Sequence, residues 1–203
     1  MEEHPLRREI VVTQAVNALV NGAGMTYFHR LSGETGATPA EIIRANFLAR
    51  EIYGSRAMLE EIASYDNKID AAVQTRMRLE VRTLVERASR WLVTNRRAPM
   101  DSEAIVDFFE IVVQRVMAEL PDLLTGQEQE AYEERLQELV AAAVPEDLAR
   151  RIAALPPSYG ILGVVDTAKR NDLEPLDVAR LHFTLGEALG LPALATRILA
   201  LPR

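Results

Sequence analysis

Apolar side chains recur every three or four residues along most of this chain, which is the spacing of one face of an α-helix. No stretch shows the alternation of apolar and polar residues that marks a β-strand. The longest apolar stripe spans 69–96, and at 1.5 Å per residue a helix there would be about 40 Å long. Its members are Ile69, Val73, Met77, Val81, Leu84, Ala88 and Trp91. The pattern predicts an all-α fold of about eight or nine helices packed around this central helix.

Caps and breakers set the expected bounds of the earlier helices. A first helix begins near Pro5, bends at Gly22 or Gly24 and ends before Gly36. Thr38 then precedes Pro39 and stands three residues before Glu41. This is the spacing of a capping box, in which two side chains satisfy the free N–H groups of a helix start. The second helix therefore begins at 38–39 and closes at Gly54, and a short helix follows over 56–65.

Prolines divide the second half into shorter pieces. Asp101 is the expected cap of a helix that runs to Leu120, because Pro121 lacks the N–H that would continue it. A loop at Thr125 and Gly126 precedes a polar helix, and further prolines break the remainder.

Two segments resemble one another without gaps, at an offset of 136 residues. Residues 38–59 align with 174–195, so that Pro39 matches Pro175, Phe47 matches Phe183 and Gly54 matches Gly190. One interpretation is a helical hairpin used twice. The other is that capped amphipathic helices resemble one another, and the sequence leaves both open.

A polar row lies on the first helix. Thr13, Asn17 and Asn21 recur every four residues, and Gly24 follows three later. Asparagine is unfavourable inside helices because its amide competes for backbone hydrogen bonds. The row therefore indicates either a contact with a neighbouring domain or an internal polar network between helices of this chain.

Charge is unevenly distributed between the halves. Residues 1–100 carry 14 basic and 12 acidic side chains, and 101–203 carry 9 and 18. An acidic second half repels phosphate backbones, so we expect no nucleic-acid partner there. The chain has no cysteine, which excludes disulfides, thiolate metal sites and cysteine nucleophiles. With no apolar run long enough for a membrane and no signal peptide, we expect a soluble, cytoplasmic protein.

We find no pattern of residues that carries chemistry. His4, His29 and His182 are isolated, and the Gly22 to Gly24 segment follows no strand. The sequence thus predicts no catalytic, cofactor-binding or metal-ligating residue in this chain.

The segment "LSGETGATPAEIIRANF" (31–47) offers an alternative function. A short turn followed by a capped helix is typical of a DNA-binding helix-turn-helix. Its outward positions would be Glu41, Ala45 and Asn46, which offer little to phosphates, with Arg44 and Arg50 as the cations in reach. This reading gives a free-standing helical regulator that binds DNA or protein.

Taken in order, several stretches resemble the large bacterial NAD-specific glutamate dehydrogenases. They are "HPLRREI" (4–10), "GMTYFHRL" (24–31), "ETGATPAEIIRA" (34–45), "LEVRTLVERASRWLVTNRRAP" (79–99), "PEDLARRIAALP" (145–156) and "LGEALGLPALATRILALP" (185–202). Each alone is a generic helical pattern, but the ordered set is specific and covers almost the whole chain.

The resemblance implies that 1–203 is the C-terminal helical region of a longer enzyme, with 1–100 and 101–203 as sub-parts. Such an enzyme oxidatively deaminates glutamate with NAD, and its catalytic domain lies upstream in the same polypeptide. We therefore expect an excised or partial chain that is not catalytic, uses no cofactor itself and supports domain arrangement or assembly of a homo-oligomer. The row of Thr13, Asn17, Asn21 and Gly24 is the candidate contact with the catalytic domain.

Overall fold

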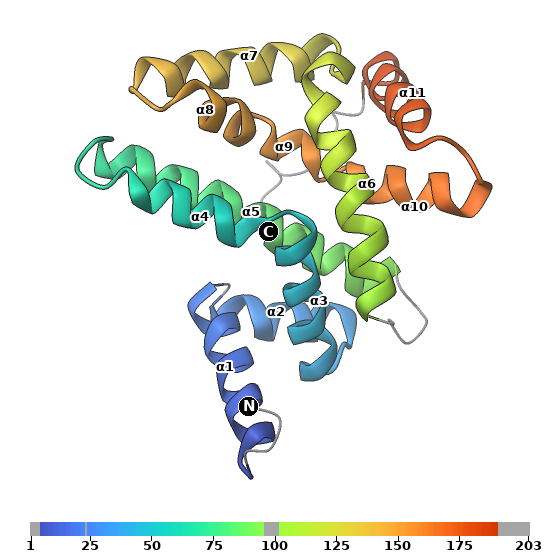
Figure 1. Cartoon of the computed structure of the whole chain (residues 1–203). Helices are drawn as coiled ribbons and strands as arrows, with labels where there is room; N and C mark the ends of the chain where they lie inside the picture. The colour runs from blue at the N-terminus through green and yellow to red at the C-terminus, as the bar shows by residue number, and fades with distance from the viewer. Residues whose placement is uncertain (1–4, 23, 96–101, 191–203) are drawn as a thin grey trace.

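The computed structural model describes residues 5–22, 24–95 and 102–190, which form helices and no strand (Figure 1). The all-α prediction is confirmed. In chain order the helices are α1 (Arg7–Gly22), α2 (Met25–Thr35), α3 (Pro39–Ile52), α4 (Ser55–Ser64), α5 (Ala71–Asn95), α6 (Ser102–Leu123), α7 (Gly126–Ala141), α8 (Glu146–Ala153), α9 (Leu155–Ser158), α10 (Ile161–Asn171) and α11 (Pro175–Ala188).

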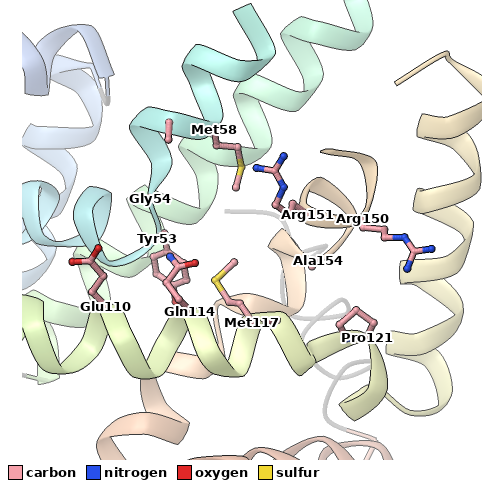
Figure 2. Close-up of a pocket in the computed structure, with 12 residues that line it drawn as sticks. Tyr53, Gly54, Met58, Glu110, Gln114, Met117, Pro121, Arg150, Arg151 and Ala154 are labelled. Carbon is pink, nitrogen blue, oxygen red and sulfur yellow. The ribbon is translucent and has the colours of Figure 1, made fainter. Parts of the chain in front are cut away.

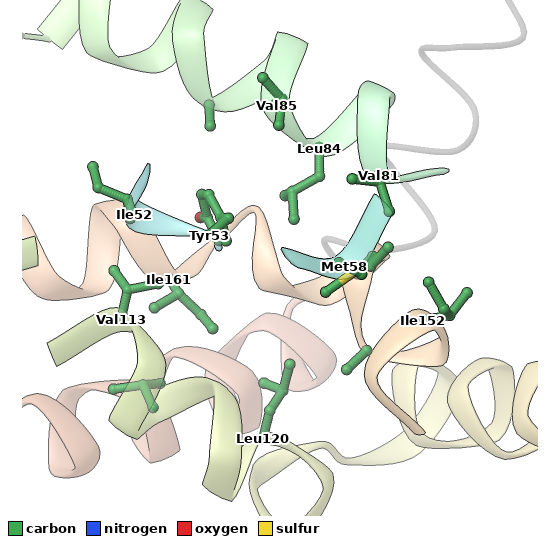
Figure 3. Close-up of a cluster of buried hydrophobic side chains, with 14 of the residues drawn as sticks. Ile52, Tyr53, Met58, Val81, Leu84, Val85, Val113, Leu120, Ile152 and Ile161 are labelled. Carbon is green, nitrogen blue, oxygen red and sulfur yellow. The ribbon is translucent and has the colours of Figure 1, made fainter. Parts of the chain in front are cut away.

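The long helix α5 is the centre of the packing, as its stripe predicted. Met77, Val81, Leu84 and Ala88 are buried along one side, where α5 meets α3, α4 and α9. Figure 3 shows Val81 and Leu84 of α5 facing the core side chains. One cluster of buried side chains continues from α3 and α5 into α6, α8 and α10, so a shared core joins residues of 1–100 and 101–203.

The first expected helix is two helices, which meet at Gly24. This glycine has φ +82° and ψ 154°, a conformation open to glycine and strained for other residues. The predicted bend is therefore a break. α2 then ends at Gly36, which adopts the left-handed conformation and donates its N–H to the carbonyl of Ser32.

The capping box at α3 forms as predicted. The backbone N–H of Glu41 donates to the Thr38 hydroxyl, and the backbone N–H of Thr38 donates to the Glu41 carboxylate over 2.7 Å. Gly54 has φ +57° and separates α3 from α4. The start of α3 is thus fixed by local chemistry.

Pro121 does not end its helix, contrary to the sequence prediction. α6 runs through it to Leu123, and Leu120, Leu123 and Leu124 are all buried. A proline in the last turn removes only the bond to the carbonyl of residue 117, and burial of these leucines outweighs that loss. The expected cap, Asp101, lies outside the described residues.

The two matched segments form helices of the same length that bury different faces. α3 and α11 are both 14 residues long, start with proline and precede a glycine of positive φ. Phe47 of α3 is 56% exposed, whereas its counterpart Phe183 of α11 is 1% exposed. The shared pattern therefore specifies the bounds of the helix but not its orientation in the core.

Candidate functional site

The polar row of α1 lies on the surface. Thr13 and Asn17 are exposed, and no hydrogen bond joins their side chains to another described residue. Asn21 belongs to α1, but its side chain lies outside the described residues. Among the described residues Thr13 and Asn17 therefore take part in no internal polar network, and their contact with another domain stays a prediction.

Apolar side chains of α1 are exposed beside this row. Leu6, just before the helix, and Val11, Val12 and Val16 within it are all at least 39% exposed. In a helix, positions 12 and 16 form a row adjacent to positions 13 and 17. α1 leaves the body of the molecule at one end (Figure 1) and packs mainly on α3. We call the surface formed by Val12, Thr13, Val16 and Asn17 the α1 face.

Gly24 does not share the α1 face. It sits at the break between α1 and α2, where an added Cβ would lie 3.0 Å from Nη2 of Arg82 on α5. The structure thus separates the four residues of the sequence prediction: two lie on the α1 face, one has no described side chain, and Gly24 fixes the turn.

A groove of about 530 Å³ runs between the α3–α4 corner, α6 and α8 (Figure 2). Met58 and Met117 line it from opposite sides, and the buried Tyr53 lies at its base. Gln114 on its wall donates a hydrogen bond of 2.8 Å to the carbonyl of Ile52, at the end of α3. The groove is therefore mostly apolar, with few polar groups, as binding sites tend to be.

The two arginines of this groove are already paired with other groups of the chain. Arg151 makes two hydrogen bonds, of 2.6 and 2.7 Å, to the carboxylate of Glu61 on α4. Arg150 pairs with Glu146 one turn earlier. Arg151 thus joins α8 to α4, whereas Arg150 pairs within α8, and neither guanidinium is open to a ligand without losing its partner.

The phenol in this groove, Tyr53, is not set up for acid–base or nucleophilic chemistry. Tyr53 is fully buried, and burial raises the pKa of its phenol far above the usual value. Its hydroxyl donates to the carbonyl of Ser158 over 3.0 Å, which ties α3 to α9. The phenol therefore stays protonated and has a structural role.

The histidines are apart from one another in the described structure. His29 is exposed on α2, and burial against the start of α10 lowers the pKa of His182. His4 lies outside the described residues. In the described ranges no three His, Cys, Asp or Glu residues come together as a metal-binding group.

The helix-turn-helix interpretation placed Ala45 and Asn46 outward, and that is wrong. Both are buried, because α3 packs between α5 and α6, and the Asn46 amide donates to the Ser89 hydroxyl on α5. A recognition helix needs a free face that carries base-reading side chains. α3 is instead a core helix.

The groove was not found from the sequence. Its two methionines occupy apolar positions that look like ordinary core, and its arginines look like a helix end. The space exists only because α4, α6 and α8 come to lie around it in the folded chain.

Comparison with known proteins places the chain in a family. The profile of the family described as "Glutamate dehydrogenase, C-terminal" matches residues 1–203. The chain belongs to this family. Within the helices of the described residues, none combines the length and the hydropathy that crossing a membrane requires.

Proteins described as NAD-specific glutamate dehydrogenases are similar in sequence to all or nearly all of this chain. An NAD-specific glutamate dehydrogenase of Halomonas elongata is 38% identical over 192 residues, 95% of this chain. Enzymes of the same description from Pseudomonas aeruginosa and Mycobacterium tuberculosis are each 32% identical over all of it. The chain spans about 12% of the length of these curated relatives. The family resemblance of the sequence motifs is thereby confirmed.

Proposed function

We propose that this chain is the non-catalytic C-terminal helical region of an NAD-dependent glutamate dehydrogenase. The longer polypeptide would convert L-glutamate, NAD⁺ and water to 2-oxoglutarate, ammonium, NADH and a proton. The proposal rests on how the relatives match this chain. Relatives named for this activity match 95–100% of the chain, and the matched part is only 12% of their own length. We place the enzyme in the cytoplasm and expect it to act as a homo-oligomer.

The role of the chain in such an enzyme is to hold domains in place. The α1 face supports this proposal, because it combines exposed valines with exposed short polar groups. A helix of this length gains most of its stability from burying an apolar side. Docking on the catalytic domain of the same polypeptide would bury Val12 and Val16 and give Thr13 and Asn17 hydrogen-bond partners. Asn21 would extend the same row, and Gly24 would set the angle at which α1 leaves α2.

An immunoblot of the source organism with an antibody against this chain tests the proposed function. We expect one band far above 22.6 kDa that co-purifies with NAD-dependent oxidation of glutamate. A band near 22.6 kDa without a larger species would overturn the proposal, as would a large species that lacks the activity.

A further inference from the structure

A second hollow, of about 310 Å³, lies between α5 and the segment around α9. One side is a face of α5 and the other is the start of α9 and the residue that follows it. The lining residues are Arg76, Leu79, Glu80, Thr83, Leu84, Arg87, Leu155, Pro156 and Tyr159.

The interior of this hollow is apolar and its rim carries the polar groups. Leu84 and Leu155 are buried, and Pro156 adds a rigid apolar wall. Leu79 and Tyr159 are exposed at the edge. An apolar floor with a few polar groups at fixed places is the usual form of a small-molecule site.

Three of the polar groups are already engaged. Glu80 accepts a hydrogen bond of 2.5 Å from Arg135 on α7, and Arg76 pairs with Glu138. Burial raises the pKa of Glu80, and the neighbouring Arg135 opposes that rise. The Thr83 hydroxyl donates to the carbonyl of Leu79. Arg76, Thr83 and one oxygen of Glu80 are thus committed within the chain, and the other oxygen of Glu80, Oε2, is buried without a hydrogen-bond partner among the described residues.

Arg87 is different. Its guanidinium lies 6.0 Å from the centre of the Tyr159 ring, and no carboxylate of the described residues pairs with it. A guanidinium is a planar fork of donors that matches a carboxylate, and it also stacks on flat rings. Among its described residues the hollow therefore presents one guanidinium without a carboxylate partner, next to an aromatic ring.

The Glu80 carboxylate, the negatively charged group in the lining of the hollow, lies at a distance from Arg87. Glu80 and Arg87 are seven residues apart on the same side of α5, which corresponds to about 10 Å along the helix axis. An anion held by Arg87 is therefore well separated from the Glu80 carboxylate, whose charge is in addition compensated by Arg135.

We propose that this hollow binds a small aromatic carboxylate. The carboxylate accepts two hydrogen bonds from Arg87, and the ring lies against Tyr159 and Leu155. A single uncommitted guanidinium matches a single negative charge, which favours a carboxylate over a doubly charged phosphate. The planar surfaces of Arg87 and Tyr159 favour a flat ring over a puckered one.

Four probes separate the parts of this proposal. Benzoate has both the charge and the flat ring, acetate lacks the ring, benzyl alcohol lacks the charge, and cyclohexanecarboxylate lacks the flatness. Trp91, the single tryptophan, lies one helical turn beyond Arg87 and reports binding through its fluorescence. We expect saturable binding of benzoate, with the other three at least about tenfold weaker.

Two substitutions locate the binding in this hollow. Arg87→Gln should weaken benzoate about tenfold, because it removes a charge-assisted pair of hydrogen bonds. Arg78→Gln is the matched control: Arg78 is exposed on the same helix, donates to Gln74 and does not line the hollow. Tyr159→Ala should weaken benzoate and leave acetate unchanged, and circular dichroism verifies that each variant is folded.

Three results would overturn the proposal. The first is that millimolar benzoate gives no saturable signal. The second is an equal loss in R87Q and R78Q, which would mean general attraction of anions to the arginines of α5. The third is equal binding of benzoate and cyclohexanecarboxylate, which would leave the aromatic ring without a role. If R87Q does not fold, the four probes with wild type and Y159A still test the first and the third of these outcomes.

Discussion

Several buried polar residues of this protein are hydrogen-bonded inside the core, whereas Glu80, Gln129 and Arg135 each have one buried side-chain atom without a hydrogen-bond partner among the described residues. Asn46 donates to Ser89, which in turn donates to the carbonyl of Val85. The Tyr27 hydroxyl donates to the carbonyl of Glu86, and burial raises the pKa of this phenol to about 12. Thr13 and Asn17 are exposed and have no such partner in the part of the chain that the structure describes, and their contact with another domain stays a prediction.

Gly24 is the residue at which a single methyl group should matter most for the backbone. Gly24→Ala should lower the free energy of unfolding by about 1–3 kcal/mol, because its φ and ψ are unfavourable for any other residue. Gly33→Ala is the control: Gly33 is exposed inside α2 with open space around it. That change should raise the unfolding free energy by about 0.5–1 kcal/mol. Urea denaturation measures both, and equal effects would contradict the strained turn.

At the scale of the element, the capping box and the glycine ends were read correctly, whereas the stop at Pro121 and the orientation of the helices were not. The capping box placed the start of α3, and Gly36 placed the end of α2. α11 has the same proline start, yet Glu174 makes no side-chain cap and pairs with Arg115 instead. The two copies therefore share their bounds and differ in what holds them, since neighbouring helices decide which face is buried.

The capping box should contribute measurably and depend on pH. Thr38→Ala should lower the free energy of unfolding by about 1 kcal/mol at pH 7, whereas Thr75→Ala, at an exposed position inside α5, should lower it little.

Hydrogen bonds from Thr38 hold the pKa of Glu41 below its usual value. A carboxyl whose pKa is lower in the folded chain than in the unfolded chain stabilises the fold at pH values above its unfolded-state pKa. This stabilisation is lost as the pH falls through the folded-state pKa. The gap between wild type and Thr38→Ala should therefore narrow on acidification, which chemical denaturation at several pH values measures. The account would be contradicted if the difference in unfolding free energy between wild type and Thr38→Ala stayed constant with pH. It would also be contradicted if the pKa of Glu41, measured by NMR, did not rise in the variant.

At the scale of the whole molecule, a shared core holds most of the helices together and leaves α1 extended from one end. That arrangement is the basis for the proposed docking on a catalytic domain. The proposed docking would cover the exposed valines of this helix, and relatives about eight times as long as this chain have ample additional polypeptide for it.

Docking through the α1 face is tested in the full-length enzyme. Val16→Asp should accelerate proteolysis between the domains about tenfold, since a buried carboxylate opposes docking. Asn17→Ala should act in the same direction more weakly. The control is Val140→Asp on α7, because Val140 is 46% exposed and Val16 is 39% exposed. The same changes should leave the unfolding of the 203-residue chain within about 0.5 kcal/mol. Equal proteolysis of the two aspartate variants, or unfolding of the chain by Val16→Asp, would refute the role of this face.

The sequence by itself determined the helical class, the long central helix and the starts and ends that local chemistry controls. It also determined the family, because its ordered motifs extend along the whole chain. Periodicity and capping act within a few residues, so they are legible without any knowledge of neighbours. Only the tertiary structure decided that α6 continues through Pro121, that Ala45 and Asn46 face the core, and that α3 and α11 bury different faces. It alone placed Arg87 beside Tyr159, 72 residues away in the chain. Such outcomes depend on which helices meet, and burial energy summed over those contacts outweighs the local preference of a single residue.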